Sequence, residues 1–255
     1  MVVGASRGIG FAMVEQLLRR TAGTVVAACR NPRKAHELSA LAVAHPDRLH
    51  VAAGVDVTQL ATLTALAEEL SQPPLGGRVD LLINTVGVLH DAGGAPAAPE
   101  RSLRDVQPEW LEHSLRTNAV GPLLLLRELA PLMRARGTER PPSVAAMLSA
   151  RVGSISDNGL GGWYSYRISK AALNMATRTA SLELKRQGTR VLALHPGTVE
   201  TGLSAPFSGN VSPSKLLTAE GSAAKLLDVI DALGSTEEPG EQHEFFDFNG
   251  KRVEW

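Results

Sequence analysis

A tyrosine and a lysine stand four residues apart in the chain, at Tyr166 and Lys170. Side chains at this spacing share one face of a helix, so we expect the ammonium of Lys170 near the phenol of Tyr166. A neighbouring positive charge favours the phenolate and lowers the pKa of a tyrosine toward neutrality. Such a phenol can donate a proton to a carbonyl oxygen or withdraw one in the reverse direction. The spacing alone is common, and two exposed side chains are the plainer interpretation.

A glycine-rich turn near the start of the chain offers a place for a phosphate. The sequence Gly4-Ala5-Ser6-Arg7-Gly8-Ile9-Gly10 lies between an apolar run and a helical segment. Glycines in this order let a strand turn tightly into a helix and let the backbone approach a pyrophosphate at the positive helix end. Gly10 also allows the helix to pack closely on the strand. The motif alone is a weak signal, and a glycine-rich loop without a ligand is the alternative.

The end of the second predicted strand discriminates between the two forms of a nicotinamide dinucleotide. Sites for the unphosphorylated form usually have an acidic residue there, which binds a ribose hydroxyl. This sequence has Cys29, Arg30 and Asn31 instead. The guanidinium of Arg30 suits a phosphate, and Arg7 in the glycine turn can reach the same group. We therefore predict NADP(H) bound beside Arg30 and Asn31, against the alternative of two solvated surface arginines.

Short apolar runs alternate with longer amphipathic segments along the chain. The predicted strands are residues 2–3, 24–29, 49–53, 79–83, 144–148 and 191–194, and the predicted helices are residues 9–20, 33–44, 60–70, 109–135, 164–186 and 213–233. Runs that are apolar throughout are typical of parallel strands covered by helices on both faces. The alternation predicts an α/β fold, a doubly wound parallel sheet in three α/β/α layers. No stretch has the length of a linker, so residues 1–255 are predicted to form a single NADP(H)-binding oxidoreductase domain.

The first predicted strand is unusual in its length. It would be central in such a sheet, yet only residues 1–3 precede Gly4. Either the strand is unusually short, or the sequence lacks some natural N-terminal residues.

Charge and composition give no indication of a nucleic-acid-binding, membrane or secreted protein. Lys plus Arg and Asp plus Glu both number 26, so no net charge draws the chain to nucleic acid or to an anionic membrane. The apolar segment 119–133 contains Pro122, Arg127 and Glu128, which argues against a membrane span, and no signal peptide is recognisable. The single cysteine, Cys29, cannot form an intramolecular disulfide, and we expect it to be buried. These features predict a soluble, cytoplasmic protein.

Two other kinds of catalytic site find no support in the sequence. The seven histidines are scattered, and no His/Cys/Asp cluster has the spacing of metal ligands, so no metal site is predicted. Ser149 and Ser154 lack the nucleophile-elbow pattern of the Ser-His-acid hydrolases.

Four weak motifs fall in the order and spacing of the short-chain dehydrogenase/reductase family. They are the glycine turn, Asn84-Thr85-Val86-Gly87, the pair Tyr166 and Lys170, and Pro196-Gly197-Thr198-Val199-Glu200-Thr201. The resemblance covers essentially the whole chain. Residues 149–174 and 245–251 look most similar to the carbonyl-reductase and C-factor-like branch. The resemblance implies a Rossmann-like fold, a nicotinamide cofactor and assembly as a homodimer or homotetramer.

The resemblance also implies roles for the residues at matching positions. The implied cofactor-binding residues are Gly4, Ser6, Arg7, Gly8 and Ile9 at the pyrophosphate and ribose, Asp56 and Val57 at the adenine, Asn84 and Gly87 beside the central sheet, and Pro196, Gly197, Val199 and Thr201 at the nicotinamide carboxamide. Lys170 would bind the nicotinamide ribose beside Tyr166, and Asn118 would hold a water that links the lysine to solvent. Thr85 and Val86 replace the inner Asn and Ala of the family's motif, and we expect weakened hydrogen bonding there.

The serine that orients the substrate in this family is harder to assign. Family members have it near the end of the fifth strand, often as the second of two serines, and here that second position is Ala150. Ser149 fits the strand end only with a shifted register, which matters because neighbouring strand residues point to opposite faces. Ser154 lies closer to the usual spacing before Tyr166. We assign Ser149, with Ser154 as the alternative, and we expect His195 to be a satisfied core or loop histidine.

Together these residues predict the NADP(H)-dependent reduction of an aldehyde or ketone to an alcohol. The predicted catalytic residues are Asn118, Ser149, Tyr166 and Lys170, and the partner is a small carbonyl or alcohol, with no nucleic acid or membrane. Because a fold alone does not prove an activity, two other functions stay open. One is a cofactor-binding regulatory or signalling protein of the same fold with little turnover. The other is an alcohol or hydroxysteroid dehydrogenase that acts oxidatively.

Overall fold

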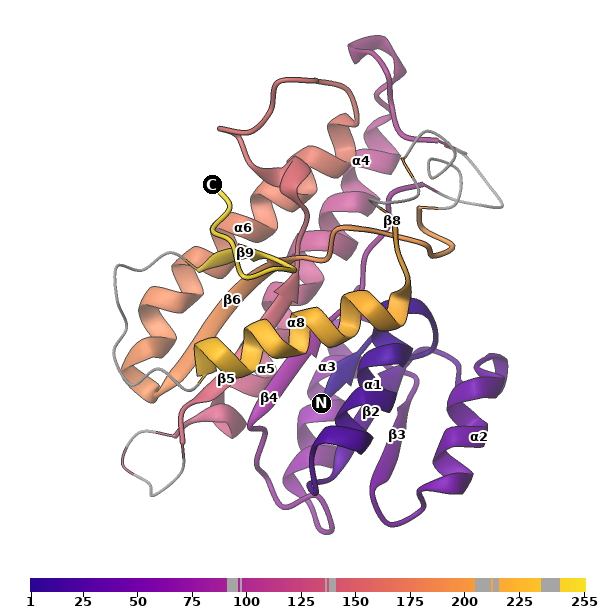
Figure 1. The fold of residues 1–255 in the computed structure, drawn as a ribbon, viewed down its shortest axis with the longest axis vertical. Coiled ribbons are helices and arrows are strands. Elements are labelled where there is room, and N and C mark those ends of the chain that lie inside the picture. Colours follow the sequence, from indigo (N-terminus) through magenta and orange to yellow (C-terminus); the bar gives the residue numbers. More distant parts are fainter. Residues whose placement is uncertain are drawn as a thin grey trace.

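The computed structural model describes residues 1–90, 96, 98–135, 137, 141–204, 212, 216–234 and 244–255. Its core is a seven-stranded parallel sheet in the order β3-β2-β1-β4-β5-β6-β9 (Figure 1). The strands are β1 (Val2–Val3), β2 (Val25–Cys29), β3 (Leu49–Ala53), β4 (Leu81–Asn84), β5 (Ser143–Leu148), β6 (Thr189–His195) and β9 (Phe245–Asp247). The strand order reverses between β1 and β4, which is where ligands bind in doubly wound sheets.

Helices cover both faces of this sheet and create two apolar cores. The main helices are α1 (Gly8–Arg20), α2 (His36–Ala44), α3 (Leu60–Ser71), α4 (Pro108–Leu115), α5 (Gly121–Met133), α6 (Tyr164–Leu184) and α8 (Ala219–Gly234). On the face nearer the viewer in Figure 1, α1 and α8 pack with α2 over one set of strand residues. On the opposite face, α3, α5 and α6 cover the alternate residues of the same strands. The predicted three-layer, doubly wound fold is thus confirmed.

The predicted elements differ from the structure in three places. The single helix predicted over residues 109–135 is divided by a π-helical turn at Arg116–Val120, between α4 and α5. The helix predicted from residue 33 begins at His36, because the chain around Pro32 forms a 3₁₀ turn first. The helix predicted from Pro213, which lies outside the described residues, begins at Ala219.

Three strands were not predicted from the sequence. Leu216–Leu217, which was expected to be helical, forms β8 and pairs in parallel with β7 (Thr198–Val199). The third is β9, which pairs with β6 at the edge of the main sheet. These short segments have too few residues to show a strand period, so their pairing partners decide their conformation.

The short first strand is held on both sides. Val2 and Val3 pair with Ala27 and Ala28 of β2 and with residues of β4. The α-amino group of Met1 donates a hydrogen bond of 2.6 Å to the carbonyl of Leu81. Burial lowers the pKa of this amino group to about 5. Both edges of β1 are therefore paired within the sheet.

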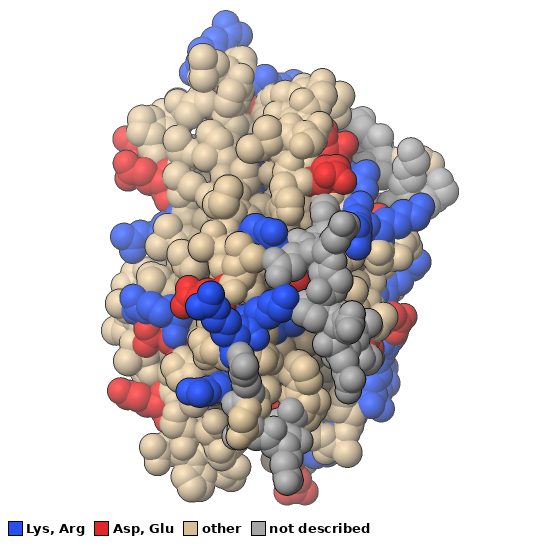
Figure 2. Space-filling model, turned by 90° about the vertical axis from the view of Figure 1, so that its left-hand side faces the viewer, with Lys and Arg blue, Asp and Glu red and all other residues tan. Residues whose placement is uncertain are grey.

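The surface carries charges of both signs. Figure 2 shows a group of Lys and Arg side chains near the middle of one face, with Asp and Glu side chains around it. No helix in the described part of the chain has the length and apolar character needed to cross a membrane. Cys29 is buried as predicted, and burial raises the pKa of its thiol.

Candidate active site

Tyr166 and Lys170 lie on the first two turns of α6, at the carboxyl ends of the central strands. The ammonium nitrogen of Lys170 is 5.7 Å from the centre of the Tyr166 ring. Lys170 is 3% exposed, and its Nζ donates a hydrogen bond of 2.8 Å to the carbonyl of Leu148 at the end of β5. The predicted proximity of phenol and ammonium is therefore present, and β5 holds the ammonium in place.

Burial controls the protonation of both side chains. It raises the pKa of Tyr166 well above that of an ordinary tyrosine and lowers the pKa of Lys170 to about 7. The expectation that the ammonium lowers the tyrosine pKa is wrong for this structure, because loss of hydration opposes the phenolate.

Asn118 lies in the π-helical turn and joins two parts of the site. Its Oδ1 accepts a hydrogen bond of 2.7 Å from the Val88 N–H, and its Nδ2 donates to the Val88 carbonyl at 2.8 Å. The same Nδ2 donates to Ser169 Oγ at 2.9 Å. Single π-helical turns often occur at functional sites. Here the turn brings the fully buried Asn118 between the loop after β4 and the tyrosine helix.

Gly87, in the loop after β4, lies close to both Asn118 and Lys170. A Cβ atom placed on Gly87 would lie 3.4 Å from Asn118 Oδ1 and 3.5 Å from Lys170 Nζ. The end of β4, the π-helical turn and α6 therefore converge, as the sequence motifs predicted.

The glycine turn has the close packing that was predicted for it. Gly4 and Gly8 have positive φ angles of 89° and 57°, which favour glycine. A Cβ on Gly10 would lie 2.3 Å from the Gly4 carbonyl oxygen, so α1 can pack on the turn only with a glycine there. Arg7 precedes α1, and its side chain forms no capping hydrogen bond. The first N–H groups of α1 are thus available to an anion, beside the half-buried Ser6 and Ile9.

The end of β2 presents charged groups to the same region. Arg7 and Arg30 are both exposed. The side chain of Asn31 accepts a hydrogen bond from the Arg33 N–H, so it stabilises the 3₁₀ turn. Burial opposes ionisation of Asp56, but hydrogen bonds from Thr58 and the charge of Arg30 outweigh it and lower the pKa of this carboxyl. Arg30 therefore lies within electrostatic reach of the residue assigned to the adenine.

Two further predicted residues of the cofactor site are buried. Val57 is 3% exposed, and a Cβ on Gly121 would lie 2.6 Å from its carbonyl oxygen. Its side chain belongs to the core under the π-helical turn. Asn84 is fully buried, and its Nδ2 has no hydrogen-bond partner among the described residues. A buried amide of this kind calls for a partner beyond the part of the chain that the structure describes.

Thr85 makes hydrogen bonds at the position where the sequence departs from the family's motif. Its Oγ1 lies 2.9 Å from the Val3 carbonyl oxygen and 3.2 Å from that of Gly4. The expectation of weakened hydrogen bonding is therefore wrong for Thr85. Its hydroxyl ties the end of β4 to the glycine turn.

The segment after β6 lies against the glycine turn. Gly197 has a φ of 82°, and a Cβ there would lie 2.9 Å from Leu217 and Phe248. The Pro196 carbonyl accepts a hydrogen bond of 2.8 Å from Ser222 Oγ. A Cβ on Gly8 would lie 3.4 Å from the methyl group of Thr201. Thr201 thus lies beside the glycine turn, as a shared cofactor site requires.

The backbone between Pro196 and Thr201 is held by a serine. Val199 is 4% exposed, and its carbonyl accepts a hydrogen bond from Ser204 Oγ. The same hydroxyl accepts a hydrogen bond of 3.2 Å from the Thr201 N–H.

His195 only partly matches the expectation. It is half-buried at the end of β6, and its Nδ1 has no hydrogen-bond partner in the described part of the chain. Burial, with a contribution from Arg151, lowers its pKa to about 4. His195 is therefore neutral at physiological pH. The expectation that its hydrogen bonds are satisfied is wrong for Nδ1.

The structure gives both candidate serines other partners. Ser149 is 3% exposed, and its hydroxyl donates a hydrogen bond of 2.5 Å to Asn174 Oδ1. The amide nitrogen of this Asn174, Nδ2, has no hydrogen-bond partner among the described residues. Ser154 is fully buried, and its Oγ accepts a hydrogen bond from the Asp157 N–H at 3.1 Å.

Sequence reasoning missed two polar residues that support this site. Arg167 donates hydrogen bonds to the carbonyls of Val152, Gly161 and Gly162, so it holds the loop before α6 against the helix. Glu100 accepts hydrogen bonds from Ser165 at the start of α6. Arg167 stands next to Tyr166 in the sequence, so its position could have indicated a role at the site. Glu100 lies 65 residues before its partner Ser165, and no local pattern links the two.

The chain is similar in sequence to proteins of one known family. The family described as short chain dehydrogenase matches residues 1–211. The chain is 34% identical over 234 residues to a 1-hydroxy-2-glutathionyl-2-methyl-3-butene dehydrogenase from a Rhodococcus species, covering 91% of this chain and 90% of that protein. It is 36% identical over 179 residues to C-signal from Myxococcus xanthus, covering 70% of this chain and 94% of that protein.

Solved structures give the same picture. The carbonyl reductase Sniffer of Drosophila melanogaster superposes with a TM-score of 0.85 at 27% identity, covering 100% of this chain and 98% of that one. An NADPH-bound carbonyl reductase from chicken fatty liver superposes with a TM-score of 0.83 at 31% identity, with the same coverage of both chains. A short-chain dehydrogenase/reductase from Burkholderia multivorans with bound NADP reaches a TM-score of 0.79 at 30% identity, again covering 100% and 98%.

Replacing Ser149 by Ala separates a structural role from a catalytic one. Loss of the buried bond to Asn174 should lower the free energy of unfolding by about 1–2 kcal/mol. Turnover should fall by far less than the roughly hundredfold that a donor to a reacting oxygen contributes. Denaturant unfolding and carbonyl-dependent NADPH oxidation measure the two effects, with Ser154→Ala as the matched variant. A hundredfold loss of kcat at unchanged stability would make Ser149 catalytic.

Proposed function

Because the chain belongs to the short-chain dehydrogenase family, we propose that it reduces an aldehyde or ketone to an alcohol with NADP(H) as cofactor. The observation that carries this proposal is the convergence of Tyr166, Lys170 and Asn118 at the carboxyl ends of β4 and β5. Three solved structures support the proposal. Sniffer and the chicken protein are called carbonyl reductases, and the Burkholderia structure contains NADP.

The cofactor would lie between the glycine turn and the segment after β6. The free N–H groups at the start of α1 would bind the pyrophosphate, and Arg7 and Arg30 would bind the 2′-phosphate. Asn84, whose Nδ2 has no hydrogen-bond partner among the described residues, pairs with Val3 next to the glycine turn. When bound, this cofactor supplies the hydride.

Tyr166 is the proposed proton donor to the carbonyl oxygen. The phenol would donate its proton as negative charge develops on that oxygen. Lys170, fixed by the Leu148 carbonyl, supplies positive charge beside the phenol and stabilises the phenolate that remains after the transfer. Asn118 keeps the π-helical turn attached to the loop after β4, beside the ammonium.

A second candidate is a cofactor-binding protein of the same fold with little turnover. The observation that favours it is that both candidate serines are buried and hydrogen-bonded within the protein. NADPH consumption with a panel of aldehydes and ketones discriminates between the two, since a pure sensor would bind the cofactor and consume none. The same panel, repeated with alcohols and NADP, tests the oxidative direction.

Replacing Tyr166 by Phe should reduce kcat at least about a hundredfold, because the proton donor to the developing alkoxide is lost. The affinity for NADPH should be unchanged, since the phenyl ring keeps the packing of the first turn of α6. Stopped-flow or steady-state NADPH oxidation with the best carbonyl of the panel measures kcat. Tyr164→Phe is the control, because it removes a neighbouring hydroxyl from the same turn. Turnover by the Tyr166 variant at the wild-type rate would exclude Tyr166 as the donor.

Replacing Arg30 by Ala should weaken NADPH binding about tenfold, because a hydrogen bond to a charged group contributes about 1.5 kcal/mol. NADH binding should not change, since NADH lacks the 2′-phosphate. Fluorescence titration with both cofactors measures the two dissociation constants. Arg33→Ala, an exposed arginine three residues along the chain, is the control. Tighter binding of NADH than of NADPH by the wild type contradicts the cofactor assignment.

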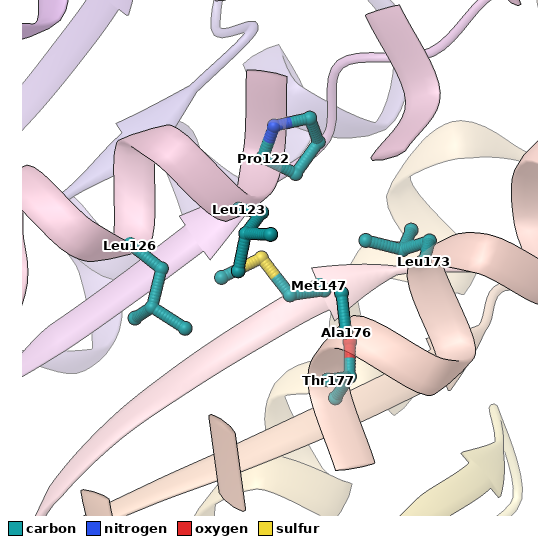
Figure 3. A pocket seen from close by; sticks show the side chains of 7 residues that line it. All are labelled: Pro122, Leu123, Leu126, Met147, Leu173, Ala176 and Thr177. Atoms are coloured by element: carbon teal, nitrogen blue, oxygen red, sulfur yellow. The ribbon is translucent and has the colours of Figure 1, made fainter. Parts of the chain in front are cut away.

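We further propose that the protein is a homo-oligomer that associates through the outer faces of α5 and α6. Val120 and Leu123, with Ile168, Met175 and Leu182 on α6, are 44–68% exposed. Between the two helices lies a small apolar pocket lined by Leu123, Ala176 and Thr177 among others (Figure 3). Exposed apolar surface of this kind is typical of interaction sites.

Replacing Leu123 and Met175 together by Glu should convert the oligomer to a monomer, because four carboxylates would face each other across a two-fold interface. Sedimentation velocity measures the molecular mass. Leu103→Glu, at a residue 71% exposed on another part of the surface, is the control. A wild-type protein that sediments as a monomer refutes the oligomer.

A further inference from the structure

The helix that carries Tyr166 begins without a capping side chain of its own. Trp163 precedes α6, has a φ of 54° and forms no side-chain cap. It is the one residue other than glycine with a positive φ angle in the described part of the chain. A backbone in this region is strained for a bulky residue and persists only where surrounding contacts hold it.

Glu100 supplies those contacts from a distant segment. Both oxygens of its carboxylate lie 3.3 Å from the Ser165 N–H, and one of them accepts a hydrogen bond from Ser165 Oγ. Its backbone carbonyl accepts a hydrogen bond of 2.6 Å from the Trp163 N–H. Glu100 is therefore bound to the residues on both sides of Tyr164, within the first turn of α6.

The carboxylate of Glu100 is buried, so hydrogen-bond donors must replace the water around it. Glu100 is 4% exposed and Ser165 is fully buried. The positive end of the α6 dipole and two N–H or O–H donors stabilise the negative charge there. Such an arrangement is stronger than a surface cap, and it fixes the start of the helix against the loop that contains Glu100.

Tyr166 follows directly after Ser165 and is in contact with Trp163. The rings of Trp163 and Tyr166 are edge to face, with their centres 6.3 Å apart. We propose that Glu100 is a positioning residue for Tyr166, which holds the first turn of α6 so that the phenol stays at the carboxyl end of β5. This inference rests on the proposed role of Tyr166 as the proton donor.

The chain contains a matched control for this carboxylate. Asp105 accepts hydrogen bonds from the N–H and the Oγ of Ser102, at 2.9 Å and 2.8 Å. The donor groups are the same as those that Ser165 offers to Glu100, but Asp105 is exposed and caps the short 3₁₀ turn at Leu103–Asp105 instead of the start of α6. Asp105→Ala therefore removes the same kind of interaction and keeps the hydrogen bonds from Ser165 to Glu100.

The experiment compares Glu100→Ala, Glu100→Gln, Ser165→Ala and Asp105→Ala in the full chain. Glu100→Ala should lower kcat about tenfold to a hundredfold, because small displacements of a reacting group have effects of this size. The dissociation constant for NADPH should stay at the wild-type value, since no cofactor-binding segment is altered. Glu100→Gln, which keeps an acceptor oxygen of the same shape, should restore most of the lost kcat. Asp105→Ala should behave as the wild type.

A second readout does not depend on turnover. The chain has two tyrosines, so Tyr166 is the only one in a Tyr164→Phe background. Its ionisation can then be followed by the near-ultraviolet absorbance of tyrosinate. Glu100→Ala should shift the titration midpoint of Tyr166, because a displaced first turn of α6 changes the packing of the phenol against Trp163. Asp105→Ala should leave the midpoint unchanged.

Each outcome decides the inference. A folded Glu100→Ala protein with wild-type kcat and an unchanged tyrosine titration overturns it, as does a loss of kcat accompanied by an equal loss of NADPH affinity. If Glu100→Ala does not fold, Ser165→Ala decides, and wild-type kcat in that variant overturns the inference. If the wild type itself shows no turnover, the proposed function fails, while the tyrosine titration still tests the positioning by Glu100.

Discussion

The site depends on one buried lysine. Lys170 is 3% exposed and lies at the point where β5, the loop after β4 and α6 meet. Burying an ammonium group is costly unless hydrogen bonds and nearby charge compensate it. Here the Leu148 carbonyl accepts its hydrogen bond, and burial brings its pKa close to neutrality. Gly153 lets α6 lie this close, since a Cβ on Gly153 would lie 2.7 Å from the Lys170 backbone and Cβ.

The doubly wound sheet explains why these groups can meet at all. Parallel strands present all their carboxyl ends at one edge, and the strand order reverses between β1 and β4. The glycine turn after β1, the Asn84 segment after β4 and the Pro196 segment after β6 therefore border one region, although they are far apart in the chain. The two polar anchors Arg167 and Glu100 then hold the start of α6 against the loops that surround it.

Local motifs predicted most of this arrangement correctly. Apolar runs and amphipathic segments located six of the strands and the main helices, because burial on both faces of a sheet leaves a recognisable pattern. The helical spacing of Tyr166 and Lys170 predicted their proximity, because residues four apart lie on the same face of a helix. The sign of the effect on the tyrosine pKa was wrong, because spacing shows which charges are near and does not show how much water is excluded. The hydrogen-bond partner of Ser149 could not be predicted either, since Asn174 lies on a helix that the sequence alone cannot place against β5.

The sequence by itself determined the identity and order of the motifs, because glycine turns, strand periods and helical spacing act over a few residues. Only the tertiary structure decided which side chains lose water and which find partners across the chain. The π-helical turn at Asn118, the buried state of Lys170 and the bond from Glu100 to Ser165 all arise from packing between segments. Packing of this kind depends on long-range contacts, and these leave no periodic signal in the sequence.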